Sequence, residues 1–390
     1  MTTLTHQMID AWADDPKGPV ALHLKQKLVP VEGDGAVIFP PTYADIGYNI
    51  DQLSDGTKVV TIDSVGSQAN RMEPIFKRDD LKHLVPQITI TLYKEMDGDN
   101  ERHENTTIFD LSHRAADAVA QSSKELGPLV ARAFRALKNR NDAFEMCCLA
   151  PTSLIFGSWD SRGGTGEKRP RLVRSVIRAY ESEGLFSAAQ FNSVWKSLSA
   201  DQKAELEKEA KAKRKKLSVV GFADAPATFR KVSPNAAKQM PEFRDGEPNP
   251  QRRVLGGVIS RNTERDVTVN LVALRRLEGS DAARTKAIRR YILGLSLIAA
   301  CDDQDLFLRS GCQLQVPSAT DEWFAVPRRG APEATSLGGK DSWNVLIGYV
   351  EKNVTTFQAC WPQQLNYDFD MKLAKALLAA AVEDEQADAE

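Results

Sequence analysis

The segment from Asp63 to Glu73 carries the residues whose types and spacing best suit the binding of an anion. It follows a strand-like run and is typical of the first turns of a helix. Ser64 is placed to cap the helix, and Ser67, Gln68 and Arg71 fall on one side of its opening turns. Hydroxyl, amide and guanidinium groups at a helix N-terminus favour a phosphate. The alternative is an ordinary capped helix whose polar residues face water.

A second basic segment runs from Trp159 to Arg178 and holds six basic residues against two acids. Its glycines, within 163–166, let the backbone approach a ligand closely. Arg174 and Arg178 share a face if residues 172–178 form a strand, and Arg171 joins them if they form a helix. Converging guanidinium groups suit phosphate contact. The alternative is a solvated loop with ion pairs, and the segment lacks the glycine spacing and G-K-[ST] ending of an ATP-binding loop.

Two further features are compatible with chemistry but have simpler explanations. His113 and Arg114 lie at a predicted helix start, where a histidine can act as a general base in RNA cleavage and an arginine can contact phosphate. A histidine without a positioned partner is more often structural. The basic cluster within 211–216 closes a predicted helix, so the helix dipole explains it as well as a nucleic-acid patch does.

The cysteines and carboxylates show no metal or hydrolase pattern. The five cysteines are odd in number and lack C-x-x-C spacing, so neither a disulfide framework nor a zinc knuckle is predicted. A reducing cytoplasm fits this usage best. We therefore expect no catalytic residues, no metal ligands and no cofactor. The cysteines are Cys147, Cys148, Cys301, Cys312 and Cys360.

Composition indicates a soluble protein with a local basic surface. The 390 residues have a formal net charge of −2 and a pI of about 6.3, which argues against whole-surface attraction to nucleic acid. The N-terminus has no basic-then-apolar signal region, and the longest apolar run, Tyr291 to Cys301, is too short to span a bilayer. We expect a cytoplasmic protein that does not bind membranes.

The order of predicted elements indicates an α+β fold with an RRM-like (ferredoxin-like) core and large helical and loop insertions. A late hairpin, with its turn at 260–263, precedes the strongest helix and a closing strand. The strands are expected at 21–29, 85–93, 153–159, 254–259, 267–274 and 311–316, and the helices near 112–123, 125–150, 187–216, 281–300, 343–351 and 369–382.

The chain is interpreted as one domain over residues 1–382. The helical segment at about 187–216, with Ser199 as a cap of its second helix, is an insertion whose role the sequence does not indicate. The acidic residues of 383–390 predict a frayed, disordered tail.

Taken in order, several blocks of this sequence resemble one known family. The chain is similar to the Cas-seven family of backbone subunits, within the repeat-associated mysterious protein superfamily, in CRISPR type I-G (formerly I-U) surveillance complexes. Each block is modest, but together they extend over most of the chain from about residue 20 to 316. The blocks are 63–73, 111–117, 151–163, 170–175, 256–259, 291–295 and 308–312.

The resemblance implies an RRM-like palm with inserted finger and thumb elements. Copies of such a subunit stack head to tail along a CRISPR guide RNA (crRNA), grip its backbone and expose its bases to a target DNA strand. Other subunits complete the complex, called Cascade, and a separate helicase-nuclease cuts the DNA, which makes this subunit non-catalytic. The implied thumb, which displaces a base at intervals, lies at 163–166 or at 221–229.

The resemblance also assigns RNA contacts to named residues. A Ser-Gln and basic pattern in related families implies guide contact by Ser67, Gln68, Asn70 and Arg71. Weaker candidates are Arg162, Arg169, Arg171 and Arg174, and Arg114 is a further candidate from its position at a predicted helix start.

Two other functions remain open at this point. The first is an endoribonuclease of the same superfamily that processes precursor crRNA with His113. The second is a protein-interaction module without a nucleic-acid role.

Overall fold

The computed structural model describes the chain with several gaps. The described residues are 3–43, 46–97, 100–160, 167–185, 193–215, 217, 222, 243–244, 247–248, 255–318, 321–338 and 340–387.

Four antiparallel strands form the centre of the main sheet. They are β1 (Ala21–Pro30), β10 (Val173–Tyr180), β15 (Asn262–Asn270) and β17 (Cys312–Gln315). Their spatial order is β17-β1-β15-β10, and every neighbouring pair is antiparallel. The last strand in sequence therefore lies beside the first, and the third separates the first from the second. This is the strand order of a ferredoxin-like core, so the predicted α+β fold is confirmed.

Further strands extend this sheet at both ends. β5 and β4 continue it beyond β10, β16 continues it beyond β17, and β18 pairs with both β1 and β19. The added strands are β4 (Ile50–Gln52), β5 (Lys58–Asp63), β16 (Phe307–Arg309), β18 (Trp323–Val326) and β19 (Glu333–Thr335).

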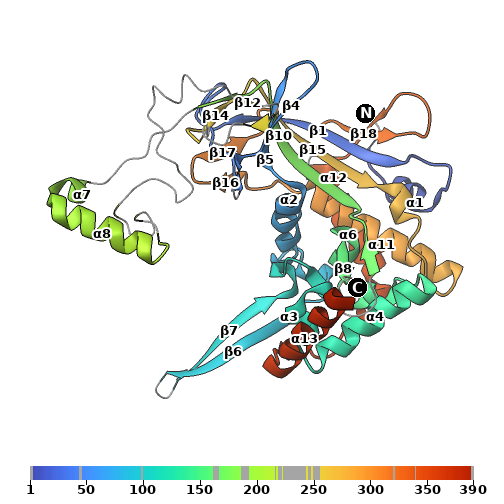
Figure 1. Cartoon of the computed structure of the whole chain (residues 1–390). Helices are drawn as coiled ribbons and strands as arrows, with labels where there is room; N and C mark the ends of the chain where they lie inside the picture. Colours follow the sequence, from blue (N-terminus) through green and yellow to red (C-terminus); the bar gives the residue numbers. More distant parts are fainter. Residues whose placement is uncertain are drawn as a thin grey trace.

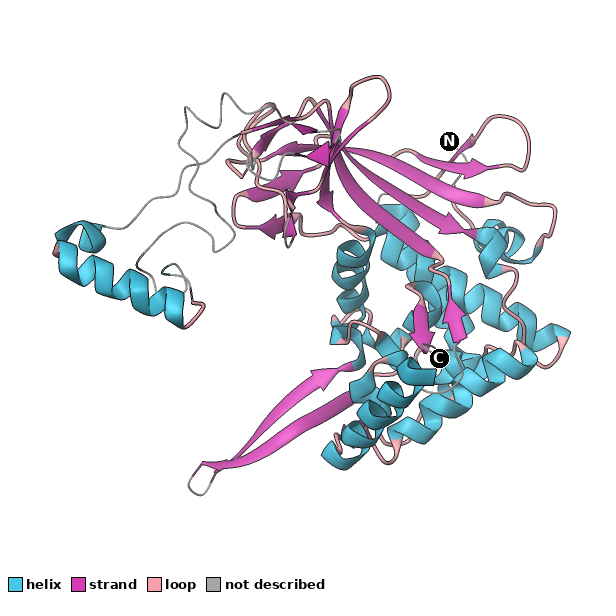
Figure 2. Cartoon of the chain, in the orientation of Figure 1, coloured by secondary structure: helices cyan, strands magenta, loops and turns pink. Residues whose placement is uncertain are grey.

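Helices cover one face of the sheet and leave the other open (Figures 1 and 2). Alternation along β15 explains this, because Thr263, Arg265, Val267 and Val269 are buried while the residues between them are partly exposed. On the open face, polar side chains pair across strands, as Lys25 does with Glu264 at 2.8 Å.

The helical layer is built around α11 (Ala282–Cys301), which Asp281 caps. Gly294 lets α12 (Lys340–Gln358) approach closely, because an added Cβ there would lie 2.6 Å from a methyl carbon of Val350. α1 (His6–Asp14) and α5 (Phe144–Leu149) contact α11, while α4 (Leu126–Arg140) contacts α5 and α2 (Val65–Met72) contacts β10.

A long hairpin of β6 (Thr89–Asp97) and β7 (Asn100–Thr107) projects from the helical layer (Figure 1). The short strand β20 (Asn366–Asp368) pairs in parallel with β6, on the edge that β7 leaves free. The final helix, α13 (Met371–Ala387), follows β20 and contacts α3 (Ala118–Gln121). The C-terminal segment therefore supports the base of the projecting hairpin.

Further elements complete the described part of the chain. The two helices of the predicted insertion are α7 (Ser193–Ser197) and α8 (Ala200–Ala212), and Ser199 caps the second one as expected. The others are β2 (Thr42–Tyr43), β3 (Gly47–Tyr48), α6 (Thr152–Ile155), β8 (Ser158–Asp160), β9 (Glu167–Arg169), β11 (Glu183–Gly184), β12 (Phe243–Arg244), β13 (Glu247–Pro248), β14 (Val258–Ile259), α10 (Leu271–Leu274) and the 3-10 helices at Glu73–Lys77, Lys82–Leu84, Ile108–Asp110 and Arg114–Ala116.

Three predicted elements were wrong in type or pairing. The buried run expected as a strand at 153–159 is instead the helix α6, followed by β8. The strand expected to continue to residue 274 ends at Asn270, whose side chain caps α10. The hairpin expected around 260–263 does not form, because β14 pairs with β11 and β15 pairs with β1 and β10.

Two other predictions were wrong in extent. The helix expected at 112–123 is divided into a 3-10 turn and the short α3, because Asp117 starts a new cap there. α13 reaches Ala387, so 383–387 is helical where a frayed tail was expected, and 388–390 lies outside the described residues. Within the described part of the chain, no helix is both long and apolar enough to cross a membrane.

The cysteine interpretation is also corrected, since Cys148 and Cys360 form a disulfide. Their separation of 212 positions gives no sequence signal, because only the folded chain brings α5 and the end of α12 together.

Candidate nucleic-acid interface

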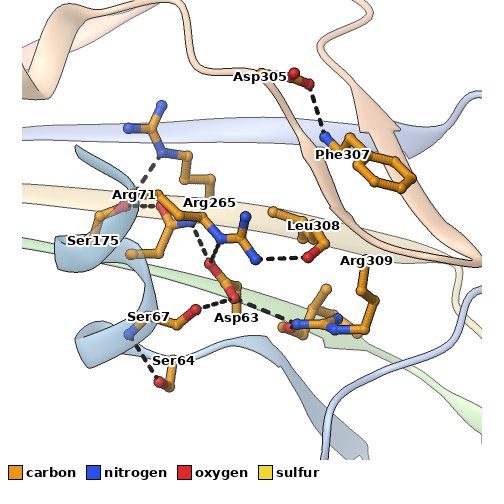
Figure 3. A network of polar contacts seen from close by, with 12 residues as sticks. Asp63, Ser64, Ser67, Arg71, Ser175, Arg265, Asp305, Phe307, Leu308 and Arg309 are labelled. Carbon is orange, nitrogen blue, oxygen red and sulfur yellow. Dashed lines mark hydrogen bonds and ion pairs between the residues drawn. The ribbon is translucent and has the colours of Figure 1, made fainter. Parts of the chain in front are cut away.

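Asp63, the last residue of β5, organises the start of α2 (Figure 3). Its carboxylate is only 1% exposed and accepts hydrogen bonds from the Ser67 hydroxyl at 2.7 Å, from Gln68 Nε2 at 2.7 Å and from Arg71 Nε at 3.0 Å. Ser64 caps the helix by accepting from the Ser67 amide. The three side chains therefore share one helix face, as predicted, but that face turns toward a buried carboxylate rather than toward water.

A second arginine, from β16, joins the same carboxylate (Figure 3). Arg309 Nη2 donates to the carbonyl of Ile62 at 3.0 Å and lies 3.5 Å from Asp63 Oδ1. Arg71 Nη2 in turn donates to the carbonyl of Leu308 at 2.7 Å, across 237 positions of sequence. The two guanidinium groups are thus fixed side by side by groups of the protein.

The pair carries more positive charge than its anchor neutralises. The side chains of Arg71 and Arg309 remain 31% and 24% exposed, whereas Asp63 is buried. Two cations therefore share one carboxylate, and part of each side chain is accessible to solvent. Such a site attracts an anion, and guanidinium groups match the geometry of phosphate oxygens.

A chain of buried hydrogen bonds connects this site to the covered face of the sheet. The Ser175 hydroxyl donates to Gln68 Oε1 at 2.7 Å and accepts from Arg265 Nε at 3.2 Å. Arg265 also donates to Gln26, which donates to Asp321 at 2.7 Å. Burial lowers the pKa of Arg265 to about 10, so it stays protonated at neutral pH. Asp63 and Asp321 are therefore linked across the covered face of the sheet.

Gln68 and Arg114 cannot contact RNA from the surface, and the structure revises both assignments. Gln68 is fully buried, and both ends of its amide are used within the protein. Arg114 is 3% exposed and forms an ion pair with Glu73, which is equally inaccessible. Arg114 also donates to the carbonyl of Gly157 and lies over the ring of Phe156 at 5.3 Å. Burial raises the pKa of Glu73 to about 7 even beside this guanidinium.

The described arginines of the second basic segment are of two kinds, structural and exposed. Arg169 donates to the carbonyl of Leu137 at 3.0 Å and to Asn141, so it closes the C-terminal end of α4. Arg171 and Arg174 are exposed. Arg174 alternates with Ser175 on β10, so it lies on the open face, opposite Asp63, and the two predicted basic groups do not converge.

The remaining predicted site residues are exposed or lie outside the described residues. Asn70 is exposed on α2, and Arg162 and most of both predicted thumb segments, 163–166 and 221–229, lie outside the described residues. His113 is exposed; its backbone amide donates to Asp117, and no hydrogen bond or ion pair joins its imidazole ring to a described residue. In the described ranges, no three His, Cys, Asp or Glu side chains gather as a metal site would need.

Sequence reasoning missed Asp63 as an anchor and Arg309 as a second cation. Asp63 lies next to the predicted cap, and Arg309 lies in the block 308–312, but neither position signals its partner. Only the placement of β16 near the start of α2 brings them together.

A comparison with known protein families gives a match to part of this chain. Residues 22–183 match the family described as CRISPR-associated protein GSU0053. The match extends from β1 to β11 and so includes Asp63, α2 and β10. It supports a role for this chain in a CRISPR system, in company with crRNA and other CRISPR-associated proteins. No curated protein matches the chain.

Proposed function

We propose that the protein is a non-catalytic crRNA-binding backbone subunit of a type I-G surveillance complex. One observation carries the proposal: Arg71 and Arg309 are fixed on buried Asp63 while part of each side chain stays accessible to solvent. Asp63 and Arg71 lie inside the family-matched segment 22–183. Arg309 comes from a strand beyond it.

The proposed ligand of this pair is the phosphate backbone. A guide must be bound whatever its spacer sequence is, so the protein has to contact phosphate and ribose and leave the base edges free. Guanidinium groups held by backbone carbonyls and a buried carboxylate lose little further freedom when a phosphate binds.

Several copies would coat one guide. Head-to-tail stacking is a heterologous contact that does not close, and it produces a helical filament. A net charge of −2 suits this arrangement, because uniformly basic neighbours would repel one another along the RNA. The exposed guide bases would pair with a target DNA strand, other Cascade subunits would cap the filament, and a recruited helicase-nuclease would cut the DNA.

Charge reversal at the paired arginines tests this function. Arg71→Glu and Arg309→Glu are each compared with Arg329→Glu, a matched change at an exposed arginine between β18 and β19. Equilibrium binding is measured for two guide RNAs with unrelated spacers, after circular dichroism has established that each variant is folded.

The proposal predicts that both site variants bind each guide at least about tenfold more weakly, by the same factor for both spacers, while Arg329→Glu binds as the wild type does. A loss confined to one spacer, or wild-type affinity in both site variants, would contradict it. Wild-type protein that copurifies without RNA and fails to bind added guide would contradict it as well.

A further inference from the structure

The disulfide between Cys148 and Cys360 joins a buried residue to an exposed one. Cys148 lies near the end of α5 and is 6% exposed, whereas Cys360 follows α12 and is exposed. The two Cα atoms are 5.6 Å apart. One sulfur of the bond therefore belongs to a residue that solvent can reach.

A pocket of about 290 Å³ opens beside this bond. Both cysteines line it, together with Phe144, Arg132 and other residues. The Arg132 side chain is 62% exposed and pairs with Glu145, so the pocket wall reaches the surface. Both cysteines of the bond therefore border a space that opens to solvent.

The bond fastens a segment that covers the edge of β6. Six positions after Cys360, β20 begins and pairs with β6, framed by hydrogen bonds from the Thr89 amide to Leu365 at 2.8 Å and from the Phe369 amide to Thr91 at 2.9 Å. Tyr367, in the middle of β20, is 3% exposed. Burial of Tyr367 in the core also holds this short strand, and the nearby covalent link adds to that packing.

The remaining cysteines are poorly suited to react. Cys147 is buried and carries no disulfide, and burial raises its pKa well above the ordinary value. Burial likewise raises the pKa of Cys301 and raises that of Cys312 to about 11. A thiol held in its protonated form is a weak nucleophile, so these three cysteines should not take part in exchange. The bond that an external thiol attacks is then Cys148–Cys360.

We propose that Cys148–Cys360 is a thiol–disulfide exchange site for a dithiol reductant, and that its reduction loosens the pairing of β20 with β6. One thiolate of the reductant attacks Cys360 Sγ, which breaks the S–S bond and leaves Cys148 as a thiolate that takes up a proton. The second thiol of the reductant then attacks the reductant's first sulfur, which is bonded to Cys360 Sγ. This breaks the mixed disulfide and releases Cys360 as a thiolate, which takes up a proton. Two electrons and two protons pass to the cysteine pair, and the reductant becomes a cyclic disulfide. This inference does not depend on RNA binding.

The first measurement asks whether the bond exists and reacts in the folded protein. Cells are lysed into N-ethylmaleimide, and peptides are mapped by mass spectrometry without reduction. A linked Cys148–Cys360 peptide that disappears within minutes in dithiothreitol without denaturant is the expected result. Absence of the linked peptide, or reduction only in urea, would overturn the proposal.

The second measurement follows the backbone amides of Thr89 and Phe369 by hydrogen exchange. Dithiothreitol should speed their exchange about tenfold or more in the wild type. Cys360→Ser should exchange at the fast rate with or without reductant. Cys301→Ser, a matched change at a cysteine outside the disulfide, should behave as the wild type does. Equal exchange of both amides before and after reduction would show that the bond fastens nothing.

Discussion

Truncation of Asp63 to alanine should destabilise the fold strongly, although one residue loses only its carboxylate. The change removes the acceptor of three short hydrogen bonds, from Ser67, Gln68 and Arg71. Ser67 and Arg71 are partly exposed and can turn to water, but the Gln68 amide is buried and would be left unpaired. A hydrogen bond to a charged group contributes about 1.5–3 kcal/mol and a buried amide left unpaired costs about 1–3 kcal/mol, so we expect a loss of about 4 kcal/mol in all.

Asp63→Asn removes only part of these interactions, so it should destabilise the fold less than Asp63→Ala does. The asparagine oxygen can keep the hydrogen bonds from Gln68 and Arg71, and its amide can donate to the Ser67 hydroxyl. The negative charge and the acceptor near Arg309 Nη2 are lost, so we expect about 2 kcal/mol.

The assay is urea denaturation followed by circular dichroism, with Asp34→Ala as the control at an exposed aspartate. The control should denature as the wild type does, Asp63→Asn should fall between, and Asp63→Ala should denature at the lowest urea concentration. If Asp63→Ala lost less than about 1 kcal/mol, Asp63 would not be the anchor of this site.

Three other predictions test the surroundings. Because the pKa of Glu73 is about 7 in the folded chain and 4.5 is its ordinary value, the folded state holds the extra proton between these pH values. Glu73 therefore contributes most below pH 4.5 and loses this contribution as the pH rises through 7, so urea denaturation should show a steeper fall for wild type than for Glu73→Gln between pH 5 and 7. Gly294→Ala should cost about 1–3 kcal/mol in the same assay through collision with Val350, whereas Gly348→Ala, with nothing within 4 Å, should gain up to about 1 kcal/mol; equal effects would refute the tight helix contact. Precursor crRNA should stay intact with the wild type, and site-specific cleavage that is lost in His113→Ala would instead establish the endoribonuclease.

The sequence predicted the fold better than it predicted the site. The period of apolar residues in 281–300 and the alternation in 21–29 report local burial, and both elements formed where expected. The run 153–159 is apolar throughout, so periodicity could not distinguish a buried helix from a buried strand, and it folds as α6 before β8. The pairing of β11 with β14 depends on the whole fold, so no local sequence pattern predicts it.

At the candidate site, the sequence predicted the shared helix face but not the burial of its residues. Ser64, Ser67 and Arg71 are local neighbours, and their helix face followed from spacing alone. Burial is not local, so nothing in the sequence separated Gln68 from its exposed neighbour Asn70. The partners of Asp63 and Cys148 come from distant parts of the chain, and sequence spacing does not encode such meetings.

The most direct measurement is the salt dependence of guide RNA binding by the wild type and by Arg71→Ala/Arg309→Ala. The logarithm of the affinity is plotted against the logarithm of the salt concentration, per protein copy bound. If both arginines contact phosphate, the slope of the double variant should be shallower by about 1.4, since each contact to single-stranded nucleic acid contributes about 0.7. An unchanged slope would mean that the pair on Asp63 does not hold the RNA backbone.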